Sequence, residues 1–286
     1  MKKHLFGAMI ALATLTACTD NDTENTNPNE NTFTLNKTTT YYPAFENFET
    51  RNVKYYDNNM IVADSTYDNS GNFISRKVHA INGSGTYTID TKNAENVNIA
   101  SEYINYDEQG RLTAHFGPDG EYHFTYNGND ILVELRLEVD VFIEVGTFTL
   151  NSDGYIASNT VVSNDVITEA TSLGFSGTTK PVWLNAQGTT GAIEQIGTFS
   201  YYPNSMPSNL QKSITEINNE VLRANSLKAA ALYGNYHLQD IMMGSNSYYH
   251  SDTVFSPVSG YEGYPEKQTI TMNGQPYCHI RYAFSN

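Results

Sequence analysis

The sequence is poor in cysteine, in basic residues and in long hydrophobic runs. Two cysteines in 286 residues cannot build a disulfide-rich scaffold or a four-thiolate zinc site. Only 16 basic side chains stand against 31 acidic ones, and the net charge of −15 repels phosphate backbones, which excludes nucleic acid as a partner. With 39% hydrophobic residues, the chain has no surplus for several membrane-spanning helices. Aromatic residues are abundant instead, with 21 tyrosines and 13 phenylalanines, and they favour strands.

The N-terminus has the pattern of an export signal. Two lysines precede an apolar run from Leu5 to Ala17, and this run of about thirteen residues is shorter than the roughly 20 that span a bilayer. We therefore expect residues 1–17 to be a signal peptide. Leu15-Thr16-Ala17-Cys18 resembles the lipobox of bacterial lipoproteins, which implies that the sulfur of Cys18 carries a lipid after cleavage. The alternative is an ordinary signal peptide with an accidental cysteine.

The segment after Cys18 predicts a flexible tether. Residues 19–30 contain no apolar side chain apart from one proline, so they cannot bury enough surface to offset their ordering entropy. Acidic residues in this place also resemble the signal that sends some Gram-negative lipoproteins across the outer membrane. We expect residues 18–32 to be the lipidated tether and residues 33–286 a single β domain. The protein would then sit at the outer membrane, facing the cell surface or the periplasm, and touch the bilayer only through its acyl anchor.

The body of the chain has a period of two. Between Ile131 and Val145 every odd position is apolar, and most even positions are charged. This alternation is typical of a strand with one buried and one wet face. Because no glycine, proline or asparagine interrupts it, the stretch is either one long bent strand or two strands joined near Asp140.

One turn motif recurs along the body. Glycine comes four residues after an aromatic or apolar strand end, and a hydrophobic residue follows two positions later; the copies are 67–73, 106–112 and 150–156. The glycine supplies the positive φ of a tight hairpin, and Asp, Asn or Ser bonds the turn backbone. Weaker copies occur elsewhere. The sequence therefore predicts a mainly β fold, an antiparallel up-and-down meander that forms a curved sheet or barrel-like structure.

One region departs from this pattern. From Ser208 to Leu222, apolar residues recur at helical spacing, and Ser208 is placed to cap the helix. A second, alanine-rich stretch runs from Ser226 to Tyr233 and stops at Gly234. We expect a short helical segment near 208–233 that plugs an open end of the sheet.

These features together resemble a known family. The Tyr-Asp-x-x-Gly-Arg-Leu turn at 106–112 is similar to the YD-type hairpin repeat. The lipobox, the repeated hairpins, the Phe199–Asn204 stretch before the helical segment and the Gly263-Tyr264-Pro265 turn resemble an uncharacterised family of Gram-negative lipoproteins with a porin-like β fold. The resemblance covers the body from about residue 50 and is weakest over 165–195. It implies a fold and a location, but no catalytic residues.

Candidate chemistry is sparse. His250-Ser251-Asp252 holds the residue types of a hydrolase triad, but adjacent side chains of a strand point to opposite faces. His115 and His123 flank a turn, and a three-residue loop would place them opposite each other, whereas a two- or four-residue loop would not. Even the favourable register supplies only two metal ligands. Alternation makes Cys278 a core residue. We expect no catalysis, no metal and no cofactor.

The aromatic residues are the best candidates for binding. Tyrosine pairs place one ring on each face of a strand, so half of these rings are candidates for stacking on sugars or docking a partner. The candidate ligand-binding residues are Trp183, Tyr201, Tyr202, Tyr248 and Tyr249. The sequence thus favours a non-catalytic envelope lipoprotein that binds a glycan or a protein. The alternatives are a structural or envelope-maintenance protein and a hydrolase with a dispersed site. A membrane-inserted barrel is disfavoured by polar strands such as residues 85–90.

Overall fold

A computed structural model describes residues 34–43, 48–57, 60–81, 86–117, 120–139, 141–163, 166–177, 179–187, 192–259 and 261–285. The expected signal peptide, Cys18 and the tether lie outside these residues. All described residues belong to one compact unit, Thr32–Asn286.

The described residues of this unit include eighteen strands. They are β1 (Thr34–Tyr42), β2 (Thr50–Asp57), β3 (Met60–Asp68), β4 (Phe73–Ile81), β5 (Tyr87–Asn93), β6 (Asn98–Tyr106), β7 (Leu112–Gly117), β8 (Gly120–Asn127), β9 (Asp130–Glu138), β10 (Val141–Leu150), β11 (Ile156–Ser163), β12 (Val166–Ser176), β13 (Lys180–Gln187), β14 (Ile193–Ser205), β15 (Tyr236–Met243), β16 (Asn246–Phe255), β17 (Pro265–Met272) and β18 (Gln275–Ser285). The stretch around Asp140 is therefore two strands, β9 and β10, as the second of the two alternatives predicts.

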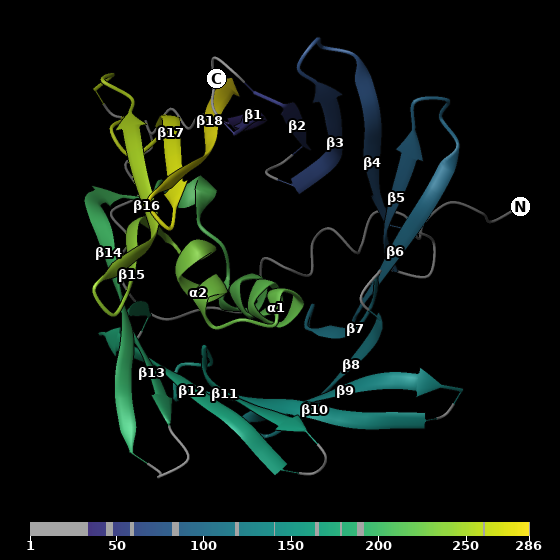
Figure 1. The fold of residues 1–286 in the computed structure, drawn as a ribbon, viewed down its shortest axis with the longest axis vertical. Helices are drawn as coiled ribbons and strands as arrows, with labels where there is room; N and C mark the ends of the chain where they lie inside the picture. Colours follow the sequence, from purple (N-terminus) through teal and green to yellow (C-terminus); the bar gives the residue numbers. More distant parts are fainter. Residues whose placement is uncertain are drawn as a thin grey trace, which may run out of the picture. The chain divides into compact units, whose positions relative to one another are not determined.

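The strands form a closed antiparallel barrel. Each strand pairs with its neighbours in sequence, and β1 pairs with both β2 and β18, which joins the ends of the sheet (Figure 1). The predicted up-and-down meander is thereby confirmed, and of the two predicted forms the sheet takes the closed one. Because every connection reverses direction, successive turns alternate between the two ends of the barrel.

The core lies inside the ring of strands. Inward-facing residues of many strands, among them Ile104, Ile131, Phe148 and Ile241, pack in one cluster with Val221 of the helical segment. Figure 1 shows both α-helices within the ring; α1 lies beside β7, and α2 lies beside β13 and β15. Burial of this apolar surface contributes about 25 cal/mol per Å² and holds the wall and the helices together.

On several strands, charged side chains point to the outside of the barrel. On β9, Glu134 and Arg136 alternate with the buried Ile131 and Val133, and on β17 Lys267 lies across from Arg281 of β18. A membrane-spanning barrel requires an apolar outer belt. These strands have the opposite arrangement, with an apolar lumen and charges outside.

Helices occupy the predicted region but begin later than predicted. Ser208–Leu210 is a 3₁₀ turn without a side-chain cap, α1 runs over Ile214–Ala224, and α2 over Lys228–Leu232. The prediction that Ser208 caps the helix is wrong. Ser213 is the cap, because Glu216 lies three residues later: its backbone N–H donates to Ser213 Oγ (3.2 Å), and its carboxylate accepts from the Ser213 N–H (2.7 Å). Within the described residues, no helix is long and apolar enough to cross a membrane.

The three predicted hairpin turns share one geometry. Gly71, Gly110 and Gly154 have φ values of +84°, +75° and +82°. In each turn the first side chain, Asp68, Asp107 or Asn151, accepts hydrogen bonds from two backbone N–H groups. These bonds satisfy the turn backbone. The hydrogen bond from the Asn72 side chain, together with those from the backbone N–H groups, holds the pKa of Asp68 below its usual range. A fourth copy, Asn93–Val97, was not predicted, because Asn96 takes the place of glycine at φ +62°.

Two adjacent asparagines dock α1 onto two of these turns. Asn219 Oδ1 accepts from the Leu112 N–H (2.9 Å), and its Nδ2 donates to the Gly110 carbonyl (2.9 Å). Asn218 repeats the arrangement with Ile156 N–H (2.9 Å) and the Gly154 carbonyl (2.7 Å). Both turns lie at the same end of the barrel. The helical segment is therefore fixed to that end by paired hydrogen bonds as well as by apolar packing.

Candidate functional site

Trp183, one of the five predicted binding residues, lies on the outer wall. It faces away from Leu184, which is buried in the core, and 41% of its surface is exposed. Its indole lies over Gly174 of the neighbouring strand, where a Cβ would overlap the ring. Trp183 thus covers a bare patch of backbone.

The four tyrosines are engaged in the fold. Tyr201 packs against the core and donates a hydrogen bond to the Pro181 carbonyl (2.7 Å). Tyr202 donates to the Ser251 carbonyl, Lys228 lies 4.4 Å from the centre of the Tyr248 ring, and Tyr249 is buried. Burial raises the pKa of Tyr249 to about 12. The structure does not bring these rings and Trp183 together on one surface.

The two histidines of the β7–β8 hairpin lie on opposite faces. Gly117 pairs with Gly120, so the loop has two residues, and His115 pairs with Tyr122 rather than with His123. His115 faces the lumen, 3.5 Å from Glu102, beside a pocket of about 150 Å³ next to α1, whereas His123 contacts Glu121 at 2.8 Å. In the described part of the chain, no group of three His, Cys, Asp or Glu side chains could hold a metal.

The triad-like residues 250–252 do not converge. Ser251 is fully buried and bonds to Gln268 (2.7 Å), on the face opposite His250. On the outer face, His250 Nδ1 lies 2.6 Å from Asp240, and Asp240 also accepts from Ser200 Oγ (2.9 Å). Here the carboxylate stands between serine and histidine, so the imidazole does not contact the hydroxyl that it would have to activate.

His250 provides a test of this outer-face cluster. The hydrogen bond to Asp240 raises the pKa of His250 above its ordinary value, so the stability that this pair contributes is present below about pH 6.5 and is lost as the pH rises through the raised pKa. Asp240→Asn should therefore destabilise the protein more at about pH 5.5 than at about pH 8.5. Urea unfolding at both pH values checks this, and an equal loss at both would contradict it.

Cys278 is a core residue, as predicted. It is buried beside Ile270, and burial raises the pKa of its thiol to about 11. A thiol so weakly acidic supplies little thiolate for catalysis.

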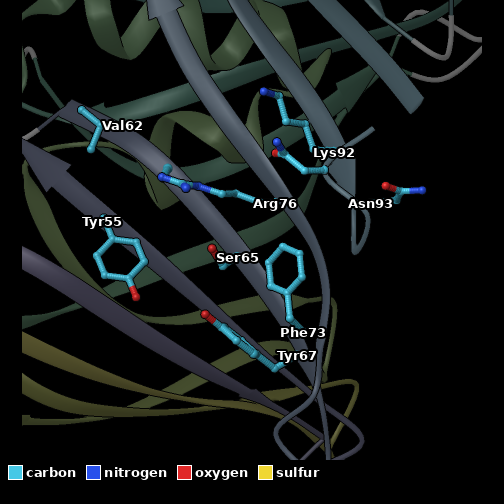
Figure 2. A pocket seen from close by; sticks show the side chains of 10 residues that line it. Tyr55, Val62, Ser65, Tyr67, Phe73, Arg76, Lys92 and Asn93 are labelled. Atoms are coloured by element: carbon cyan, nitrogen blue, oxygen red, sulfur yellow. The ribbon is translucent and has the colours of Figure 1, made fainter. Parts of the chain in front are cut away.

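A pocket of about 450 Å³ lies on the outer wall of β2 to β5 (Figure 2). Its face is fixed by the strand register. Lys77 points into the lumen, where it pairs with Glu102 at 3.2 Å, so the adjacent Arg76 points outward. Ser65, Arg76 and Lys92 lie in one row across β3, β4 and β5. The lining residues are Tyr55, Val62, Ala63, Ser65, Tyr67, Phe73, Arg76, Lys92, Asn93 and Asn96.

Aromatic rings surround a floor of small residues. Figure 2 shows the rings of Tyr55, Tyr67 and Phe73 around Ser65, and Ser65 and Ala63 are buried beneath them. Tyr67 meets Phe73 edge-on at 5.8 Å between ring centres, and Arg51 lies 4.7 Å from the centre of the Tyr67 ring. The stacked guanidinium and the neighbouring ring hold Tyr67 in place at the pocket.

Polar groups form the rim next to the β5–β6 turn. Asn93 Oδ1 accepts the Val97 N–H (2.9 Å) within the turn, so its amide nitrogen remains as a donor at the pocket. Asn96 adds a second amide. Arg76 and Lys92 supply two cations, and the ten lining residues include no carboxylate. The pocket thus combines ring faces, amide donors and positive charge within the size range of small-molecule sites, roughly 300–1,000 Å³.

Comparisons with known proteins find likeness of structure but not of sequence. No protein-family model and no curated protein matches the chain. A porin-like protein from Bacteroides uniformis is similar with a TM-score of 0.40 and 12% identity over 88% of this chain and 96% of that chain. A porin-like protein from Bacteroides vulgatus is similar with a TM-score of 0.32 and 12% identity over 88% and 98%. The barrel of this chain is established by its own strand pairing, and its lipidation and lipoprotein family stay predictions.

Proposed function

We propose that this protein is a non-catalytic, saccharide-binding lipoprotein of the cell envelope, and that the outer-wall pocket of β2 to β5 holds the sugar. The observation that carries the proposal is that Tyr55, Tyr67 and Phe73 line one pocket together with Asn93 and Asn96.

Sugar rings present apolar C–H faces and hydroxyl edges. Exposed aromatic rings match the faces, while amides and a serine hydroxyl match the edges. Because the pocket stands on paired strands and on a hydrogen-bonded turn, its backbone is already ordered before binding, which limits the ordering cost.

The absence of carboxylates from the lining supports a non-catalytic role. Most glycosidases use two carboxyl groups that flank the scissile bond, and the ten lining residues supply none. In this pocket a bound saccharide would be held without being cleaved.

Glycan-array binding of the full chain carrying Cys18→Ser tests the proposal. We expect saccharides to bind above background, and the double change Tyr55→Ala and Tyr67→Ala to weaken binding about tenfold, because stacking on each ring is worth roughly 0.5–1.5 kcal/mol. Trp183→Ala is the matched control on the same outer wall and should leave binding unchanged.

Thermal unfolding monitored by circular dichroism would show that the variants stay folded. The single variant Tyr55→Ala, which truncates an exposed ring, provides a second measurement of how much binding depends on the pocket. The proposal is wrong if no saccharide binds, or if binding depends on Trp183 and not on the pocket tyrosines.

A further inference from the structure

We propose that the saccharide held in this pocket is acidic, with a carboxylate, as in a uronic acid, bound between Arg76 and Lys92. This inference rests on the proposed function and names the class of sugar.

The two cations lie directly across from each other. Arg76 of β4 and Lys92 of β5 are register partners, and both side chains line the pocket (Figure 2). Like charges in this cross-strand position destabilise a sheet. A bound anion between them would turn that repulsion into attraction, and the planar guanidinium matches both oxygens of a carboxylate.

Several other cations of the barrel have acidic partners. Lys77 pairs with Glu102 (3.2 Å), and Arg136 pairs with Glu121 (2.9 Å). Within the described residues, Arg76 and Lys92 take part in no ion pair. The chain has many more acidic than basic residues and a net charge of −15, yet the lining of this pocket contains no acidic residue. The local charge is therefore opposite to that of the whole molecule and complementary to an anion.

A neutral sugar does not need this arrangement. Its hydroxyl groups are satisfied by the amides of Asn93 and Asn96 and by Ser65, and its ring face by the tyrosines. Two unpaired cations beside these groups add attraction only for a ligand with negative charge.

Paired glycans that differ in one group test the inference. Uronic-acid oligosaccharides, their methyl esters and the corresponding neutral sugars are bound to the full chain carrying Cys18→Ser. We expect the acids to bind about tenfold or more tightly than their esters at low salt, and this preference to shrink as salt screens the charges.

Arg76→Gln and Lys92→Gln should each remove most of the preference for the acid while leaving weak binding of the neutral sugar. Lys77→Gln is the matched control, because it removes the same charge from the neighbouring residue of β4 on the lumen face. It should leave the preference unchanged.

The outcomes separate this inference from the proposed function. Saccharides that bind through Tyr55 and Tyr67 with no preference for the acid, or a preference that persists in Arg76→Gln and Lys92→Gln, would overturn the acidic ligand and leave saccharide binding intact. No binding of any saccharide would overturn both.

Discussion

Replacing Asn219 by aspartate is expected to lower the free energy of unfolding by about 2–3 kcal/mol. The asparagine is buried, and its two polar atoms serve opposite roles, accepting from Leu112 and donating to the Gly110 carbonyl. Aspartate keeps the acceptor but sets a second oxygen, with negative charge, against that carbonyl. Both the lost donor and the repulsion act in a site shielded from water.

Urea or thermal unfolding at several pH values checks this prediction. The new carboxyl should have a raised pKa in the folded state, so the penalty is present at neutral pH and shrinks as the pH falls through that pKa, where the protonated acid again donates to Gly110. Asn246→Asp is the control, since it adds the same charge at the exposed start of β16. A loss equal to that of the control would show that Asn219 does not fix α1.

Gly146→Val should cost about 3 kcal/mol or more, or prevent folding. A Cβ on Gly146 would overlap the backbone carbonyl oxygen of Thr160 on β11. A backbone group cannot move aside without breaking the pairing of β10 with β11, and the two strands end in the Asn151–Tyr155 turn, whose Gly154 carbonyl accepts from Asn218. The expected damage therefore extends from the wall to the helix.

The variant Gly174→Val tests whether a clash with a side chain costs less stability than a clash with backbone. There the new Cβ meets the indole of Trp183, an exposed side chain that can rotate toward water. We expect a smaller loss of stability and a red shift of the tryptophan fluorescence, which reports on this residue alone because the chain has one tryptophan. Equal losses in the two variants would contradict the argument for Gly146.

The hairpin turns were predictable because their chemistry is local. Gly71, Gly110 and Gly154 meet a backbone requirement that no other part of the fold alters. The start of α1 was predicted wrongly because helical spacing alone did not separate Ser208 from Ser213. The Ser213-x-x-Glu216 pattern was readable in the sequence and decides the helix start.

The pocket could not be predicted because it depends on register. Tyr55, Arg76 and Lys92 belong to three strands, and a shift of one residue in any pairing would turn one of them into the lumen. The same dependence on packing explains why the predicted tyrosines do not form a binding surface. Alternation shows that Tyr201 and Tyr202 leave a strand on different faces, but not that the core packs against one and Ser251 accepts from the other.

Closure of the barrel also limits how anything can bind to it. Since β1 pairs with β2 on one side and with β18 on the other, the ring of described strands has no free edge. A peptide cannot add a strand to such a sheet, and neighbouring molecules cannot join it edge to edge. Any partner must therefore be recognised by side chains on the wall and by the turns, because the backbone hydrogen-bonding groups of the paired strands are already used within the ring.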